Sequence, residues 1–358
     1  MSEYTAAVVA AGSQGRVHAA GYRSNDVELV AVADPNLELA QELAADLQIP
    51  RAFGGYEELL GAIRPDFVSV CTPPRFHLDV IRASIAAGVK AIHCEKPIAT
   101  SFGDVLLAQS LAEEAGVQLT FNLQRRFEPV HRFAREQIAA GTIGDVVSIE
   151  GFCPNLPDWG THIMDLILFY LDDARPSWVM GQVDVATNRY VYGQFAETSS
   201  LTQVSWPSGI YATVYTGREP QTPVLNLANN TGLIVHGTAG RIESRGSRCL
   251  VQRFGEPDVE FATPFSTDSE SWDRGVDPAI IACTAEAIGD ALSALKNGTE
   301  PTLSARRGVA GAELIFATYE SSRSRARIAL PLQSRDNALL DGLERGFWSP
   351  VGEQRSTY

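Results

Sequence analysis

The sequence contains few basic residues and no long apolar run. Lys and Arg total 29 against 43 Asp and Glu, which gives a formal net charge of −14 without any long run of basic residues. Such a chain repels a phosphate backbone, so we expect no nucleic-acid partner. No segment approaches the roughly 18 uninterrupted apolar residues of a membrane span, so we expect no membrane partner.

An export signal and paired cysteines are also missing. The first residues, MSEYTAAVVAAG, carry an acid where a signal peptide needs lysine or arginine, and the apolar run leads directly into a glycine turn. The cysteines form no C-x-x-C pair, and they are Cys71, Cys94, Cys153, Cys249 and Cys283. We interpret them as small buried residues in a reducing compartment, the alternative being a reactive thiol. These features predict a cytoplasmic protein.

The first 122 residues repeat a strand, a turn and a helix that ends at glycine. We predict strands at 5–10, 27–34, 67–72, 89–95 and 117–121, and helices within 36–47, 76–88 and 102–116. Apolar strands that alternate with helices predict an α/β fold with a doubly wound parallel sheet, because both sheet faces must be covered. Ligands of such sheets bind beyond the carboxyl ends of the strands.

The pattern changes after about residue 145. Longer, partly alternating strands are predicted at 145–152, 177–187, 198–206, 209–217 and 231–238, and helices at 160–171 and within 277–298 and 304–322. These runs favour a mainly antiparallel sheet with one packed face. With 358 residues, we therefore expect a domain at 1–122, a second at 123–333 with a bridging helix at about 129–140, and a patternless tail at 334–358.

The first predicted strand leads into AAGSQGRVH, residues 10–18. Compared with G-x-G-x-x-G, the loop supplies the second and third glycines, Gly12 and Gly15, and has Ala10 in place of the first. Asp34 follows 22 residues beyond Gly12, where an acid can accept both ribose hydroxyls and would repel a 2′-phosphate. The pattern favours NAD over NADP. The alternative is an ordinary glycine turn, with Asp34 capping the next helix.

Polar residues follow two of the predicted strands. The strand at 67–72 leads into CTPP and then His77, and the strand at 89–95 leads into Glu95, Lys96 and Pro97. Because parallel strands deliver their carboxyl ends to one edge of a sheet, both segments are expected beside the nucleotide loop. Glu95 and Lys96 could also form a solvated ion pair, which is the common fate of neighbouring opposite charges.

Five motifs, in this order and spacing, closely resemble the Gfo/Idh/MocA family of nicotinamide-dependent oxidoreductases. They are AAGSQGRVH at 10–18, VADPN at 32–36, CTPPRFH at 71–77, EKPIA at 95–99 and DWGTHIMD at 158–165, and the resemblance continues to ARIALPL at 326–332. It implies an N-terminal Rossmann domain, a C-terminal α+β domain with an open, mainly antiparallel sheet, and oxidation or reduction of a sugar-like alcohol at the domain interface. It also implies a homo-oligomer, a dimer or tetramer formed through the outer face of that sheet.

By this resemblance, Lys96 matches the active-site lysine, and Asp158 and His162 match a D-x-x-x-H pair. Oxidising an alcohol requires a base for the hydroxyl proton, and a histidine has a pKa near neutrality, so His162 is the predicted base. The Lys96 ammonium can stabilise the developing alkoxide, and Asp158 can hold a hydroxyl or that ammonium. Alternatively, Asp158 is a helix N-cap and His162 a helix-start residue satisfied by backbone.

The remaining predicted contacts extend these motifs. Predicted NAD contacts are Gly12, Ser13, Gln14, Gly15, Asp34, Thr72, Pro73, His77, Glu95, Lys96 and Asn122. Predicted substrate contacts are Lys96, Arg125, Arg126, Asn155, Asp158, Trp159 and His162. By the resemblance, Glu95 contacts the nicotinamide ribose, and one arginine is expected to reach an anionic substrate group. His77 could instead face solvent, and Trp159 could either stack on a sugar ring or lie in the core.

No metal is predicted. Asp158, His162 and Asp165 share a helix and could ligate one, but no further cluster of His or Cys supports this, and hydride transfer needs no metal. Asp165 is read as an orienting residue at most.

The motifs predict an NAD-dependent enzyme that oxidises a ring hydroxyl of a carbohydrate substrate: a sugar, a sugar derivative or a cyclitol. An alternative within the resemblance is an NAD-dependent glycosidase, which oxidises C3 transiently, eliminates the aglycone, adds water and reduces the ketone again, and which could accept an acidic glycoside such as a sulfoquinovoside. A third possibility is a non-catalytic NAD-binding sensor.

Overall fold

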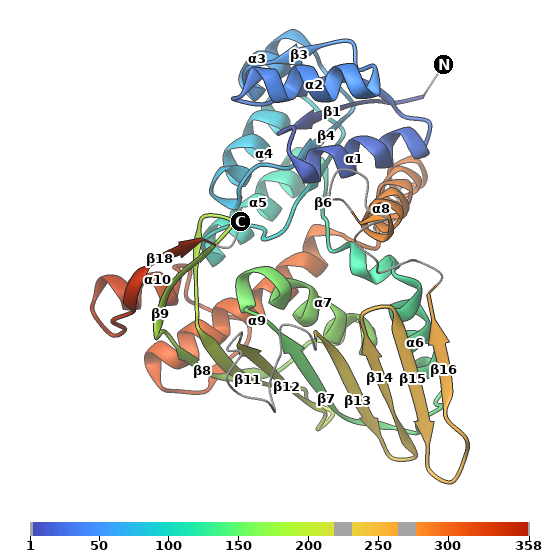
Figure 1. The fold of residues 1–358 in the computed structure, drawn as a ribbon, viewed down its shortest axis with the longest axis vertical. Coiled ribbons are helices and arrows are strands. Elements are labelled where there is room, and N and C mark those ends of the chain that lie inside the picture. The colour runs from blue at the N-terminus through green and yellow to red at the C-terminus, as the bar shows by residue number, and fades with distance from the viewer. Residues whose placement is uncertain (1–2, 218–230, 264–276, 357–358) are drawn as a thin grey trace. The chain divides into compact units, whose positions relative to one another are not determined.

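A computed structural model describes residues 3–217, 231–263 and 277–356 of the chain (Figure 1). The chain forms two compact units, each built from segments that are distant in the sequence. Unit 1 comprises residues 1–99, 104–127 and 265–309, and unit 2 comprises residues 100–103, 128–264 and 310–358. The two units are described separately below.

Unit 1 contains a six-stranded parallel sheet with the order β3-β2-β1-β4-β5-β6. The strands are β1 (Thr5–Val9), β2 (Glu28–Ala33), β3 (Ala52–Phe53), β4 (Phe67–Val70), β5 (Ala91–Cys94) and β6 (Gln118–Phe121). The helices are α1 (Ser13–Ser24), α2 (Leu37–Leu47), α3 (Tyr56–Ala62), α4 (His77–Ala86) and α5 (Phe102–Ala115), with short turns of 3₁₀ helix at η1 (Pro74–Phe76) and η2 (Gln124–Phe127). The predicted doubly wound parallel sheet is confirmed.

The strand order of this sheet reverses between β1 and β4, because successive strands are added outward on opposite sides of this pair. β1, β2 and β3 occupy one half, and β4, β5 and β6 occupy the other. The loops after β1 and β4 therefore lead away from each other, which opens a crevice for a ligand at the carboxyl ends of these two strands.

Helix α8 (Pro278–Asn297) belongs to unit 1, although the boundary predicted at residue 122 assigned it to the second domain. Ile288 joins the core cluster of the sheet, Asn25 Nδ2 donates to Ala285 O at 2.8 Å, and Gln118 Nε2 donates to Ala291 O at 2.8 Å. Among the described residues, α8 is the one helix long and apolar enough to cross a membrane by length and composition. Its packing on unit 1 accounts for its apolar face.

Unit 2 contains a nine-stranded sheet with the order β16-β15-β14-β13-β7-β12-β11-β8-β17, in which only the β7 and β12 neighbours are parallel. Its strands are β7 (Val146–Cys153), β8 (Trp178–Asp184), β11 (Ser199–Ser205), β12 (Tyr211–Gly217), β13 (Gly232–Gly237), β14 (Gly240–Arg245), β15 (Arg248–Arg253), β16 (Val259–Ala262) and β17 (Ile328–Ala329). A smaller sheet joins β9 (Thr187–Val191) to β10 (Gln194–Ala196) and β18 (Val351–Ser356). The predicted open, mainly antiparallel sheet is confirmed.

Helices cover one face of the nine-stranded sheet. They include α6 (Pro129–Ala139), α7 (Thr161–Tyr170) and α9 (Ala305–Ser324). A Cβ at Gly151 of β7 would lie 2.8 Å from Ile163 of α7, and one at Gly181 of β8 would lie 2.6 Å from Thr318 of α9. Small residues in these strands therefore let the helices approach closely, whereas Leu201 on the opposite face stays 45% exposed.

The tail that was predicted to be patternless contains helix α10 (Ala338–Glu344) and strand β18, which pairs in parallel with β9. Asn337 caps α10 by accepting a hydrogen bond from Leu339 N at 3.1 Å. Arg323 of α9 donates to Asp341 of α10 at 2.8 Å, so charged side chains fasten the tail to unit 2.

Candidate active site

The loop from β1 to α1 has the geometry of a glycine-rich nucleotide loop, despite the alanine at its first position. Ala10 has φ +82°, a conformation that glycine adopts more easily, and its N–H donates to Ala33 O at 2.7 Å. A Cβ at Gly15 would lie 2.0 Å from Ala10 O, so no side chain fits there. A Cβ at Gly12 would meet nothing within 4 Å, so the main chain is open to a ligand at that residue.

Asp34, at the end of β2, supports this loop directly. Its Oδ2 accepts a hydrogen bond from Ala11 N at 2.9 Å, and its Oδ1 accepts one from Asn36 N at 2.8 Å. The predicted helix cap is a different residue, because Asn36 accepts from Glu38 N at 3.1 Å. Asp34 therefore ties the end of β2 to the nucleotide loop, and its carboxylate remains partly exposed at the sheet edge.

Two polar atoms near this edge are suited to an external ligand. Gln14 Oε1 in the first turn of α1 and Thr72 Oγ1 after β4 are buried, and neither has a hydrogen-bond partner among the described residues. Ser13 and Pro73, beside them in the chain, are exposed. Buried polar atoms usually find a partner, so both atoms, together with the open main chain at Gly12, fit a dinucleotide.

The carboxylate of Glu95, immediately after β5, lies inside unit 1 and is 4% exposed. Its Oε1 is 2.9 Å from His18 Nε2 and accepts from Asn122 Nδ2 at 2.7 Å, while its Oε2 accepts from the main-chain N–H of Lys96 at 3.1 Å. Burial alone would raise the pKa of Glu95, but the contacts with His18, Lys96 and Asn122 together lower that pKa to about 2. The carboxylate is therefore ionised, and its hydrogen bond with the N–H of Lys96 fixes the main chain from which the lysine side chain extends.

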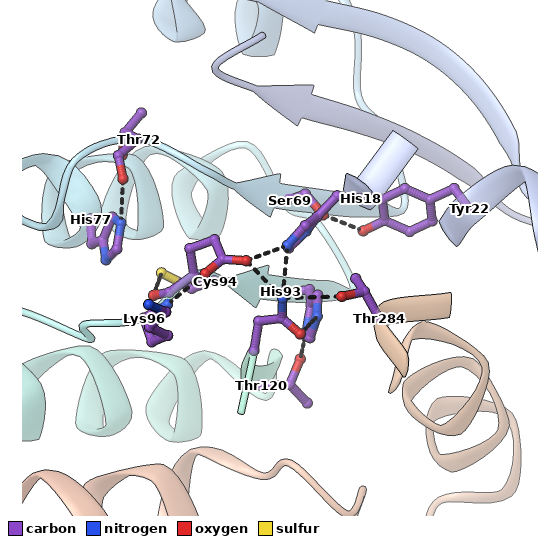
Figure 2. Close-up of polar contacts among 12 residues, drawn as sticks. His18, Tyr22, Ser69, Thr72, His77, His93, Cys94, Lys96, Thr120 and Thr284 are labelled. Carbon is purple, nitrogen blue, oxygen red and sulfur yellow. Dashed lines mark hydrogen bonds and ion pairs between the residues drawn. The ribbon is translucent and has the colours of Figure 1, made fainter. Parts of the chain in front are cut away.

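The contacts of Glu95 continue into a buried polar network (Figure 2). His18 Nδ1 is 2.8 Å from Ser69 Oγ on β4, and that hydroxyl is 2.9 Å from the Tyr22 hydroxyl. On the other side, His93 Nδ1 is 2.8 Å from Thr120 Oγ1. Burial, and secondly the nearby His18 ring, lower the pKa of His93 to about 3, so this ring is neutral at pH 7.

His77 connects the turn after β4 to the segment after β5. Its ring is fully buried, with Nε2 2.6 Å from Thr72 O and Nδ1 3.1 Å from Ile98 O. Burial lowers the pKa of His77. The alternative that His77 faces solvent is wrong. Together with Glu95 and Asn122, it was expected to contact NAD, and the structure places all three side chains in internal hydrogen bonds.

In unit 2, a one-turn π-helix, η3 (Leu156–Gly160), precedes α7 and carries Asp158. Asn155 caps this turn: its Oδ1 accepts from Asp158 N and its main-chain O accepts from Gly160 N, both at 2.8 Å. Thr161 Oγ1 in turn donates to Asp158 O at 2.6 Å. The N-cap is therefore Asn155 and not Asp158. Such single π-turns often occur at functional sites.

His162 lies in the first turn of α7 and is 3% exposed, and Asp158 is 4% exposed. The Trp159 ring meets the His162 ring edge to face, with 6.3 Å between centroids, and is half-buried. Asp165 is buried on the same helix, beside Gly311 of α9. The structure thus brings Asn155, Asp158, Trp159 and His162 together in η3 and the first turn of α7.

The two arginines predicted to contact substrate follow β6 in η2. Arg126 is 2% exposed and is among the largest fully buried side chains, whereas Arg125 is half-buried. Of the two, Arg125 is therefore the better placed to meet a ligand.

Three residues of this arrangement were missed by the sequence interpretation. His18 stands in the quoted loop but reads as part of an apolar helix face, His93 reads as a strand interior, and Glu197, whose Oε1 accepts from Leu156 N at 2.6 Å, stands between two strands. A polar residue within an apolar run was the available signal for the two histidines. The described residues contain no group of three or more His, Cys, Asp or Glu that could hold a metal ion, and all five cysteines are free thiols.

Comparison with known proteins agrees with this geometry. Residues 4–123 match the model of a family described as "Oxidoreductase family, NAD-binding Rossmann fold". The chain is 25% identical to D-apiose dehydrogenase of Paraburkholderia graminis, over 92% of this chain and 90% of that protein. It is 26% identical to D-xylose 1-dehydrogenase (NADP(+)) 2 of Haloferax volcanii, over 86% of this chain and 94% of that protein.

A solved structure shares the fold over most of the chain. Levoglucosan dehydrogenase, in complex with NADH and levoglucosan, superimposes with a TM-score of 0.77 at 17% identity, covering 92% of this chain and 99% of that one. The similarity therefore extends through both units.

Proposed function

Because this chain belongs to the Gfo/Idh/MocA family of oxidoreductases, we propose that it transfers hydride between NAD and a ring hydroxyl of a sugar, a sugar derivative or a cyclitol. The observation that carries this proposal is the end of β5, where the ionised Glu95 holds the main chain of Lys96. β1, β4 and β5 are parallel neighbours, so Lys96 emerges at the same sheet edge as the nucleotide loop. The names of the sugar dehydrogenases above support this substrate class.

NAD is the proposed coenzyme, and it accepts the hydride when bound. Gly12 leaves room for the pyrophosphate, and the N-terminus of α1 favours its charge. The partly exposed Asp34 carboxylate accepts ribose hydroxyls and repels the additional phosphate of NADP. Gln14 and Thr72 supply the buried polar atoms described above.

The chain's own residues manage the proton and the charge on the oxygen. In alcohol oxidation, His162 takes the hydroxyl proton while hydride leaves the carbon, so the alcohol becomes a carbonyl. The Lys96 ammonium stabilises the negative charge that develops on the oxygen. Asp158 binds a neighbouring hydroxyl and so fixes the orientation of the ring.

An assay with two readouts tests the proposal. Purified protein and NAD are incubated with sugars, cyclitols and aryl glycosides, while NADH and free aglycone are followed separately. NADH formation without aglycone release supports the dehydrogenase. Aglycone release without net NADH would replace it with the NAD-dependent glycosidase, and neither product from any substrate would favour an NAD-binding sensor.

Lys96→Ala then tests the assigned chemistry. It should abolish turnover and change NAD affinity by less than about two-fold, since the lysine acts on the transition state. Lys90→Ala is the matched control, because Lys90 precedes the same strand but is exposed and pairs with Asp66 at 2.8 Å. Full activity of Lys96→Ala would refute the role of this lysine.

We also propose that copies of the chain associate through the outer face of the nine-stranded sheet, as the family resemblance implies. That face exposes Met180, Leu201 and Tyr211, each more than 40% accessible. A cavity of about 770 Å³ opens on this face, lined in part by Met180, Leu201 and Trp348. Light scattering of the purified protein tests this, and a monomer at micromolar concentration would exclude it.

A further inference from the structure

A buried carboxylate in unit 2 contacts the turn that carries Asp158. Glu197, between β10 and β11, is 0% exposed. Its Oε1 accepts from Leu156 N at 2.6 Å and from Thr216 Oγ1 at 3.1 Å, and its Oε2 accepts from the Tyr319 hydroxyl at 3.1 Å. One side chain therefore joins three elements: the η3 turn, strand β12 and helix α9.

The donors to Glu197 are all uncharged. They are one main-chain N–H and two hydroxyl groups, and none of them belongs to a Lys, Arg or His. Burial raises the pKa of Glu197, and the hydrogen bonds from Leu156, Thr216 and Tyr319 oppose that rise. A carboxyl group without a cationic partner is tolerated in an interior only where its oxygens accept hydrogen bonds, so these contacts hold their donors firmly.

The turn that Glu197 holds is already bonded within itself. Asn155 accepts from the N–H groups of Asp158 and Gly160, so hydrogen bonds close residues 155–160 into one turn. Glu197 is bonded to this turn at Leu156 and, through Thr216 and Tyr319, to the sheet and the helix beneath it. The orientation of the turn relative to β12 and α9 therefore depends on Glu197.

We infer that Glu197 is a positioning residue: its hydrogen bond to Leu156 N anchors the main chain and so orients the side chains of Asp158 and His162. This inference rests on the proposed function, in which Asp158 and His162 act on the substrate. Displacing catalytic groups by about 1 Å can lower a rate by roughly 100-fold without any direct contact to the substrate. Glu197→Ala should therefore lower kcat by about 10- to 100-fold in a folded protein.

The variants separate positioning from general stability. In Glu197→Gln the side-chain oxygen still accepts from Leu156 N, and the side-chain NH₂ can donate to the Tyr319 hydroxyl. This variant should therefore keep most of the wild-type activity. Glu313→Ala is the matched control, because Glu313 is also buried, 6% exposed, and accepts a main-chain N–H, Leu332 at 2.7 Å, away from the turn. NAD affinity should be unchanged in all three variants, since the nucleotide loop lies in unit 1.

Hydrogen exchange tests the same inference without any substrate. Mass spectrometry of peptides that span residues 153–162 should show faster amide exchange in Glu197→Ala, and wild-type exchange in Glu197→Gln and Glu313→Ala. Wild-type exchange in Glu197→Ala, or a kcat loss no larger than that of Glu313→Ala, would overturn the inference. If the wild-type protein turns over none of the substrates, the proposed function fails, while the exchange rates still decide whether Glu197 anchors the turn.

Discussion

Acidification should destabilise the protein through His93. This residue of β5 is 2% exposed, its Nδ1 is 2.8 Å from Thr120 Oγ1, and its ring centroid is 5.0 Å from that of His18. Burial and the His18 ring lower its pKa to about 3, whereas an unfolded chain binds the same proton near pH 6.5. The unfolded state therefore holds more protons between these values, and the free energy of unfolding falls as the pH falls through this window.

The size of the effect follows from the pKa difference. One titrating group contributes at most about 1.4 kcal/mol per pH unit, and an unfolded chain is only half protonated at pH 6.5, so protonation of His93 costs roughly 2 kcal/mol between pH 6.5 and 4.5. Glu95 acts in a lower window: its pKa is lowered from 4.5 to about 2, so its stabilising contribution is complete above pH 4.5 and is lost only as the pH falls toward 2. His77, whose pKa burial also lowers, adds to the same slope as His93.

Urea unfolding at pH 6.5, 5.5 and 4.5, followed by circular dichroism, measures this slope. His93→Gln should reduce it by at most about 1.4 kcal/mol per pH unit, because the variant carries no imidazole there to protonate. Equal slopes for the wild type and His93→Gln would refute the reasoning, as would an imidazole NMR signal of His93 that titrates near pH 6.5.

Three further predictions concern the nucleotide loop. Ala10→Gly should raise the free energy of unfolding by about 0.5 to 1 kcal/mol, measured by thermal denaturation, because glycine relieves the positive φ; a lower melting temperature would contradict this. Gly15→Ala should weaken NAD binding by more than roughly ten-fold, measured by calorimetry, because the new Cβ would lie 2.0 Å from Ala10 O. Wild-type affinity would mean that the loop accommodates the side chain without cost. Asp34→Ala should weaken NAD binding and narrow the preference for NAD over NADP, and unchanged NAD affinity would remove Asp34 from the ribose site.

Periodicity was sufficient to predict the parallel strands of unit 1 and the long helices, because each has an apolar pattern of its own. Strand β3 was missed because it contains only two residues. Strands β14 and β15 were missed because Arg241, Glu243 and Arg248 interrupt their apolar residues, and only pairing with neighbouring strands selects the extended form. A strand defined by its neighbours leaves a weak signal in its own sequence.

The same limit applies to the candidate site. The strand ends predicted where Lys96 would lie, since a parallel sheet fixes that edge, but they could not predict what Glu95 contacts. Its partners His18 and Asn122 are 77 and 27 residues away in the chain, and the expectation of a ribose contact came from the motif alone. Likewise, the amphipathic stripe of α8 predicted a helix without saying which sheet the stripe would cover.

The return of α8 to unit 1 has a consequence for protein synthesis. Leu123 and Phe127 after β6 are buried against Cys283, Ala287 and Leu303, which the ribosome adds much later. At roughly 5–20 residues per second, the interval between residue 127 and residue 309 lasts about 10 to 40 s. During that time the sheet that carries the nucleotide loop lacks its last covering helix, so a shortened chain that ends at residue 127 would expose this apolar surface permanently. The nascent chain must therefore make most of unit 2 before unit 1 can close its own core.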